Sequence, residues 1–92
     1  MSTNLNIFDR VVSVIIKNYK IPLNKDQINE DTDVLIDLGF ESIKILEMIV
    51  YLEEEFIIEF DDESLVIDKL KTVGMIVRTI KVLIERGIIN DS

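Results

Sequence analysis

The chain has 92 residues and a formal net charge of −8, and it contains neither cysteine nor histidine. This composition excludes disulfides, thiolate sites and most zinc sites, and it removes the usual pairs of nucleophile and base that an independent enzyme needs. The length and the 48% hydrophobic content predict one domain over residues 1–92, with an ordered core at about 4–87. No apolar run is long enough to cross a membrane and no signal segment begins the chain, so we expect a soluble, cytoplasmic protein.

The acidic residues are concentrated in the middle of the chain. Between Asp26 and Asp68 there are fifteen acidic residues and one basic residue, Lys44, whereas the rest of the chain holds three acidic and nine basic residues. Such a field repels nucleic acid and steers basic protein surfaces toward the middle segment. A simpler interpretation is that acidic faces only keep a small protein in solution.

The first predicted helix covers residues 4–19. Apolar side chains recur at helical spacing, and Asn4 is placed to cap the start of the helix. Pro22 prevents the helix from continuing beyond Lys20. The predicted core stripe consists of Leu5, Phe8, Val12, Ile15 and Tyr19.

Residues 20–41 form a long connection without clear periodicity, of a length that is uncommon in compact domains unless the loop is functional. We expect a short helical turn near residues 25–29. The apolar side chains of the connection are expected to insert into the bundle and hold the loop in place; they are Ile21, Leu23, Ile28, Val34, Leu35, Ile36 and Leu38.

The second predicted helix covers residues 42–56, and its core stripe is Ile45, Met48, Ile49, Leu52 and Phe56. The opposite face carries Ile43, Glu47, Val50 and Glu54, with Glu53 at its edge. The two apolar residues on this face have two interpretations. They are scattered surface residues, which are common, or they supply burial in a contact surface that the glutamates orient.

After a short link at residues 57–60, Asp61-Asp62-Glu63-Ser64 predicts the start of a short third helix that ends near Ile67 or Asp68. Thr72 is expected to cap the last helix, and Gly87 to end it, with residues 88–92 fraying. The core stripe of this helix is Val73, Ile76, Val77, Ile80, Leu83 and Ile84. The predicted fold is an all-α bundle of three main helices plus one short helix, with a long loop between the first and second helices.

The sequence contains few candidates for a catalytic, metal-binding or modification site. A calcium loop that begins at Asp31 would need glycine at Ile36 and glutamate at Ser42, so no metal site is predicted. Ser42 stands at the mouth of the second helix, after Gly39 ends the loop, and free N–H groups at a helix mouth suit a phosphate. Most serines at such positions are only helix caps. Because no histidine or other base is available, Ser42 cannot activate itself; if it is used chemically, it is a site that another enzyme modifies and not a catalytic residue.

The segment Thr32-x-x-Leu35-x-x-Leu38-Gly39-Phe40-Glu41-Ser42-Ile43 resembles the acyl carrier proteins and the closely related peptidyl carrier domains. Their central pattern is typically Leu-Gly-x-Asp-Ser-Leu, with 4′-phosphopantetheine on the serine. Leu46-Glu47 and Leu52-Glu53-Glu54-Glu55-Phe56 resemble the second helix of this family, and Thr72-Val73-Gly74 resembles the opening of its last helix. The similarity covers nearly the whole chain and implies the acyl-carrier fold.

The resemblance implies that a phosphopantetheinyl transferase moves the arm from coenzyme A to Ser42, within a motif that includes Gly39 and Glu41. The thiol of the arm then holds an acyl, aminoacyl or polyketide group as a thioester. The implied partners are a loading enzyme and downstream synthases or transferases with basic patches. Neither nucleic acid nor a membrane is an expected partner, and the chain is expected to be a monomer. The residues of this chain that are implied to dock these partners are Ile43, Glu47, Val50, Glu53 and Glu54 on the second helix, with Val66 from the third.

Two features depart from the family pattern. Glu41 replaces the usual aspartate, and its longer side chain is a poorer helix cap, so modification is expected to be slower or to need a dedicated transferase. About two extra residues precede Thr72, which implies a different orientation of the third helix. The alternatives to an acyl carrier are a peptidyl carrier and a carrier-fold interaction module that is never modified.

Overall fold

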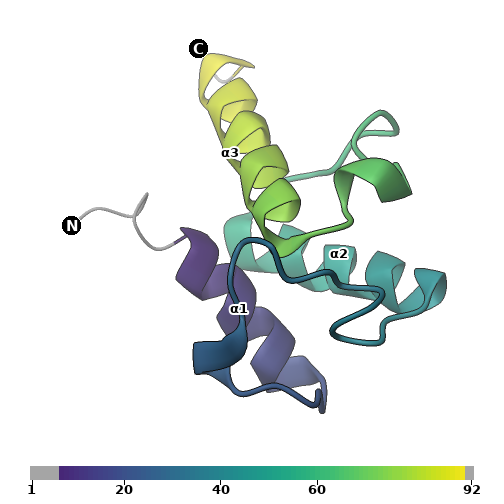
Figure 1. Cartoon of the computed structure of the whole chain (residues 1–92). Coiled ribbons are helices and arrows are strands. Elements are labelled where there is room, and N and C mark those ends of the chain that lie inside the picture. Colours follow the sequence, from purple (N-terminus) through teal and green to yellow (C-terminus); the bar gives the residue numbers. More distant parts are fainter. Residues whose placement is uncertain (1–6, 91–92) are drawn as a thin grey trace.

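The computed structural model describes residues 7–90 and contains three α-helices and two short 3₁₀ helices (Figure 1). Among these residues there is no β-strand, only an isolated bridge between Asp33 and Thr72. The prediction of an all-α bundle with a long loop between its first two main helices is confirmed. In chain order the elements are α1 (Ile7–Asn18), η2 (Lys25–Gln27), α2 (Ser42–Phe56), η3 (Ile67–Lys69) and α3 (Val73–Asn90).

Helix α1 packs against both α2 and α3. Val12 and Ile15 of the predicted stripe are almost completely buried, and so is Val11, which the predicted stripe did not include. The predicted start at Asn4, and with it Leu5, lies outside the described residues. Beside the core, the Arg10 Nε donates to Glu55 Oε2 at 2.9 Å, and the guanidinium lies 4.3 Å from the centre of the Phe56 ring. Arg10 therefore ties α1 to the last turn of α2.

The loop between α1 and α2 is held down by its apolar side chains, as predicted, except at one position. Ile28, Val34 and Leu38 are buried, and η2 forms where a helical turn is expected. The prediction for Ile36 is wrong, since 78% of this residue is exposed. The Asp33 carboxylate accepts hydrogen bonds from the N–H groups of Leu35 and Ile36, each at 2.8 Å. The tight turn that these bonds close directs the Ile36 side chain toward solvent.

Backbone hydrogen bonds fasten the same loop to the start of α3. Val34 N–H donates to Lys71 O at 2.9 Å, and Val73 N–H donates to Thr32 O at 3.0 Å. Gly74 N–H donates to Glu30 O at 2.9 Å. In Figure 1 the dark-blue loop accordingly passes the beginning of α3 before it reaches α2. The segment that leads into α2 is therefore fixed by α3 as well as by its own side chains.

The predicted bounds of the third helix are wrong. Residues 62–64 form a single turn in which the N–H of Ser64 donates to both the backbone and the carboxylate oxygen of Asp61, each at 3.0 Å. Val66 is extended, with φ −111° and ψ 129°, and only η3 follows. An aspartate that closes a turn on itself competes with helix formation, and the β-branched pair Val66-Ile67 favours extended backbone.

Helix α3 begins as predicted and ends later. The Thr72 hydroxyl oxygen accepts the Met75 N–H at 3.1 Å, which confirms Thr72 as the cap, and the stripe from Val73 to Leu83 is buried. The prediction that Gly87 ends the helix is wrong, because α3 continues to Asn90. Gly87 is not among the glycines with positive φ, so it adopts ordinary helical geometry. No helix among residues 7–90 is long and apolar enough to span a membrane.

Candidate functional site

The approach to α2 is set by two buried residues on either side of one glycine. Leu38 and Phe40 are each at most 5% exposed, and Gly39 between them has φ +74°. A side chain is strained in that left-handed conformation, so glycine is the residue that lets both neighbours turn inward. The Phe40 ring packs against Tyr19 with 4.7 Å between ring centres. Ser42 therefore follows a firmly anchored turn.

Ser42 occupies the first helical position of α2, and Glu41 is the N-cap. The first intrahelical bond runs from Ile45 N–H to Glu41 O at 3.0 Å, so the N–H groups of Ser42, Ile43 and Lys44 precede the helical ladder. The Glu41 side chain makes no capping hydrogen bond. Ser42 is exposed, and its hydroxyl has no hydrogen-bond partner within residues 7–90. The hydroxyl is thus free for a modifying enzyme to reach, and it is not used as a cap.

The charge around Ser42 suits a covalently attached phosphate. The first turn of α2 contains no acidic residue, and it includes Lys44, whose Nζ lies 6.0 Å from the centre of the Tyr19 ring. The positive end of the helix dipole and the free N–H groups add to this favourable field. The residues present therefore fit a phosphodiester on Ser42, through the free N–H groups of the first turn.

The outward face of α2 carries the apolar residues that the sequence placed there and one that it missed. Ile43 is 79% exposed and Val50 is 52% exposed, as the helical spacing predicts. Leu46, at 51% exposure, lies three residues after Ile43 and four before Val50, so it shares their face. The same spacing would have found it, had Leu46 been assigned to a face. Three exposed apolar side chains in a row form a larger patch than two.

The carboxylate of Glu47 is held by Tyr19, the residue that directly follows α1. The Tyr19 hydroxyl donates to Glu47 Oε1 at 2.9 Å. Burial, and then the hydrogen bond and charge of Glu47, raise the pKa of the Tyr19 hydroxyl above its usual value, because the phenolate would be poorly solvated and would face a carboxylate. Glu47 is exposed as predicted, yet it is oriented by a partner that lies 28 positions away in the sequence.

The remaining predicted docking residues differ in what they contact. Glu54 is exposed on α2, whereas the Glu53 carboxylate accepts the backbone N–H of Phe60 at 2.9 Å and secures the link after the helix. Val66 is 43% exposed, but it precedes η3, which packs on α3. The structure therefore brings Ile43, Glu47, Val50 and Glu54 together on one helix, and it gives Glu53 a structural contact.

Comparison with known proteins agrees with this geometry. The chain matches the family described as a phosphopantetheine attachment site over residues 9–80, which includes Ser42 and all of α2. The chain is therefore a phosphopantetheine-binding carrier, and its cofactor is 4′-phosphopantetheine. It belongs to the acyl carrier protein family, whose members carry cargo and are not catalysts, and which interact with phosphopantetheinyl transferases and synthases.

Three relatives are similar along most of their length. The acyl carrier protein of Lactobacillus acidophilus is 39% identical over 75 residues, which cover 82% of this chain and 89% of that protein. The acyl carrier protein of Wolinella succinogenes is 35% identical over 75 residues, or 82% and 93% of the two chains. That of Thermotoga maritima is 32% identical over 81 residues, or 88% and 95%.

Proposed function

We propose that Ser42 carries the 4′-phosphopantetheine arm and that the protein holds acyl intermediates on it as thioesters, in fatty acid, polyketide or related secondary-metabolite biosynthesis. The observation that carries the proposal is the exposed, unbonded hydroxyl at the first turn of α2, beside three N–H groups that precede the helical ladder. The arm supplies the thiol that the chain itself lacks. Gly39 and Glu41 belong to the motif that presents the serine.

The attachment step needs an external catalyst. The Ser42 Oγ forms a bond to the phosphorus of the pantetheine phosphate, the pyrophosphate bond of coenzyme A breaks, and adenosine bisphosphate leaves. The Oγ proton must go to a base on the phosphopantetheinyl transferase or to water, because the chain has no histidine. The role of this chain is to hold the hydroxyl in the open and to stabilise the resulting phosphodiester with the first turn of α2.

The test is the intact mass of the protein after incubation with coenzyme A and a broad-specificity phosphopantetheinyl transferase. The expected result is a gain of one phosphopantetheine in the wild type and in Ser13→Ala, an exposed serine of α1, and none in Ser42→Ala. A gain in Ser42→Ala would refute Ser42 as the site. No gain in the folded wild type, with a dedicated transferase also tried, would favour the unmodified interaction module.

The cargo is proposed to be acyl, because the acidic outward face and the relatives named acyl carrier protein both favour that class. The alternative is a peptidyl carrier of a nonribosomal peptide pathway. Loading assays on the arm-bearing protein separate the two. An acyl carrier is expected to accept a malonyl group from malonyl-CoA and a malonyltransferase. A peptidyl carrier would instead accept an amino acid from ATP and an adenylating enzyme.

The proposed partner face comprises Ile43, Glu47, Val50 and Glu54, to which the loading enzyme and downstream synthases present basic patches; Glu53 and Val66 are peripheral to it. Glu54→Lys is expected to weaken partner binding and lessen its dependence on salt without unfolding the domain. Glu47→Lys also removes the hydrogen bond from Tyr19, so Tyr19→Phe is its matched control. If partner kinetics at low salt stay unchanged in both lysine variants, the face is wrongly assigned.

A further inference from the structure

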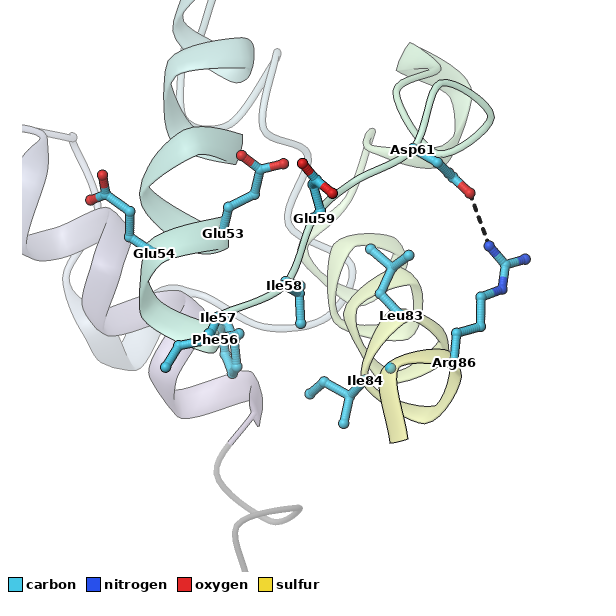
Figure 2. A pocket seen from close by; sticks show the side chains of 11 residues that line it. Glu53, Glu54, Phe56, Ile57, Ile58, Glu59, Asp61, Leu83, Ile84 and Arg86 are labelled. Carbon is cyan, nitrogen blue, oxygen red and sulfur yellow. Dashed lines mark hydrogen bonds and ion pairs between the residues drawn. The ribbon is translucent and has the colours of Figure 1, made fainter. Parts of the chain in front are cut away.

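The end of α2, the link at residues 57–61 and the last turns of α3 surround an open groove of about 930 Å³. Its floor is apolar, because Ile58, Leu83 and Ile84 face the space between the link and α3 (Figure 2). Leu83 is buried, while Ile58 and Ile84 are only partly covered by the core. This volume lies within the range of about 300–1,000 Å³ that is usual for binding clefts in proteins.

The rim of this groove is strongly acidic. It carries four carboxylates and one guanidinium, from Glu53, Glu54, Glu59, Asp61 and Arg86. The Arg86 guanidinium is already paired with the Asp61 carboxylate at 2.9 Å, as the dashed line in Figure 2 shows. The charges of Glu53, Glu54 and Glu59 are therefore not balanced by a cation of the groove. A partner that is complementary to the rim must be positively charged.

The packing of the fold does not explain why an isoleucine occupies position 57, at the edge of the groove. Ile57 is 89% exposed, and its backbone lies in the left-handed region with φ 55° and ψ 54°. Such a helix end is usually occupied by glycine or asparagine, and a β-branched residue is strained there. The core gains nothing from this side chain, so an isoleucine at this position offers an apolar contact to something outside the chain.

We propose that this groove docks a cationic amphipathic helix of a protein partner, with its apolar side over Ile57, Ile58 and Ile84 and its basic side over Glu53 and Glu59, which lie beside each other on the rim (Figure 2). The fifteen residues of α2 separate the groove from Ser42 by about 20 Å. A partner bound here leaves the serine accessible to a second protein. Docking does not require the arm, so the proposal stands or falls independently of the modification of Ser42.

The test uses a labelled peptide of about 14 residues with leucine on one helical face and lysine on the other. Binding to the unmodified protein is followed by fluorescence anisotropy and mapped by amide NMR. The largest shift changes are expected at Ile57, Ile58, Ile84 and Gly87. Affinity should fall when the sodium chloride concentration rises from about 50 to about 300 mM.

Two pairs of variants make the test specific. Ile57→Asn is expected to weaken binding about tenfold while it raises thermal stability, because asparagine tolerates the left-handed backbone; loss of binding then has nothing to do with unfolding. Ile36→Asn, at the comparably exposed isoleucine of the first loop, should leave the affinity unchanged. Glu59→Gln should weaken binding, whereas Asp26→Asn, in η2, should not.

Three results would overturn the proposal. One is a shift map centred on the first turns of α2, which would place the peptide on the face near Ser42. Another is equal weakening by Ile36→Asn and Ile57→Asn, which would mean non-specific adhesion. The last is a set of concentration-dependent shifts at the groove without peptide, which would make a second copy of the chain the occupant.

Discussion

The first loop approaches α3 closely at Gly74, and Gly74→Ala tests that contact. A Cβ at this position would lie 3.0 Å from the carbonyl oxygen of Glu30 and 3.1 Å from its Cβ. The same carbonyl accepts the Gly74 N–H at 2.9 Å. The carbonyl cannot retreat from the new methyl group without lengthening this hydrogen bond, so the loop must shift.

The expected sign comes from two opposed terms. Replacing a helical glycine with alanine gains about 0.5–1 kcal/mol, because alanine loses less backbone entropy on folding. Overpacking against a fixed neighbour costs about 1–3 kcal/mol. Because the neighbour here is backbone, we expect a net loss of about 1 kcal/mol, which corresponds to a fall of about 4–8 °C in Tm for a domain of this size.

Gly87→Ala is the matched control, since a Cβ on Gly87 meets nothing within 4 Å. It should gain about 0.5–1 kcal/mol, so the two variants are expected to move the free energy of unfolding in opposite directions. Urea denaturation followed by circular dichroism at 222 nm measures both. If Gly74→Ala is as stabilising as Gly87→Ala, the loop is not clamped to α3 in the way the hydrogen bonds indicate.

Three further predictions concern α2 and its neighbours. Glu41→Asp should raise the free energy of unfolding by about 0.5–1 kcal/mol in urea titrations, because the N-cap makes no side-chain bond and aspartate can make one. In the Tyr51→Phe protein, where Tyr19 is the remaining tyrosine, absorbance at 295 nm should show Tyr19 titrating above the usual tyrosine pKa. Because the pKa is raised in the folded state, the contribution of Tyr19 to stability is complete below the unfolded-state pKa of about 10 and is lost at higher pH. A normal titration would argue against the Glu47 contact. Ile45→Ala should cost about 2–5 kcal/mol, measured by the same denaturation, because its side chain is fully buried; a change below about 1 kcal/mol would contradict the assigned core.

The sequence predicted the parts of the fold that depend on periodicity. The predicted span of 42–56 matches α2, and all five residues of its predicted stripe are buried, because fifteen residues give four turns over which a 3.6-residue period is unambiguous. The exposure of Ser42 and Ile43 follows from the same register. The position of the helix mouth is therefore predictable from the amino-acid sequence alone.

The features that the sequence did not predict arise from contacts or from local competition. Tyr19 reaches Glu47 only because α1 packs against α2, and no local pattern encodes that hydrogen bond. Residues 61–68 combine a good helix start with a serine that Asp61 can bond two ways, and the turn wins over the helix. Gly87 does not adopt the positive φ with which a glycine commonly ends a helix, and α3 continues past it.

The position of Ser42 depends on the first loop as well as on the helix that contains it. Phe40 N–H donates to Val34 O at 2.9 Å, and Val34 N–H donates to Lys71 O at the same distance, so the residues before Ser42 are bonded in series to the segment that begins α3. Val34 is completely buried, which protects this connection from water. A carrier whose partners must find one hydroxyl benefits from such a frame, because a loop of this length would otherwise let the helix mouth move. Variants that loosen the loop, such as Gly74→Ala, are therefore expected to slow the proposed modification of Ser42 by more than their loss of stability explains.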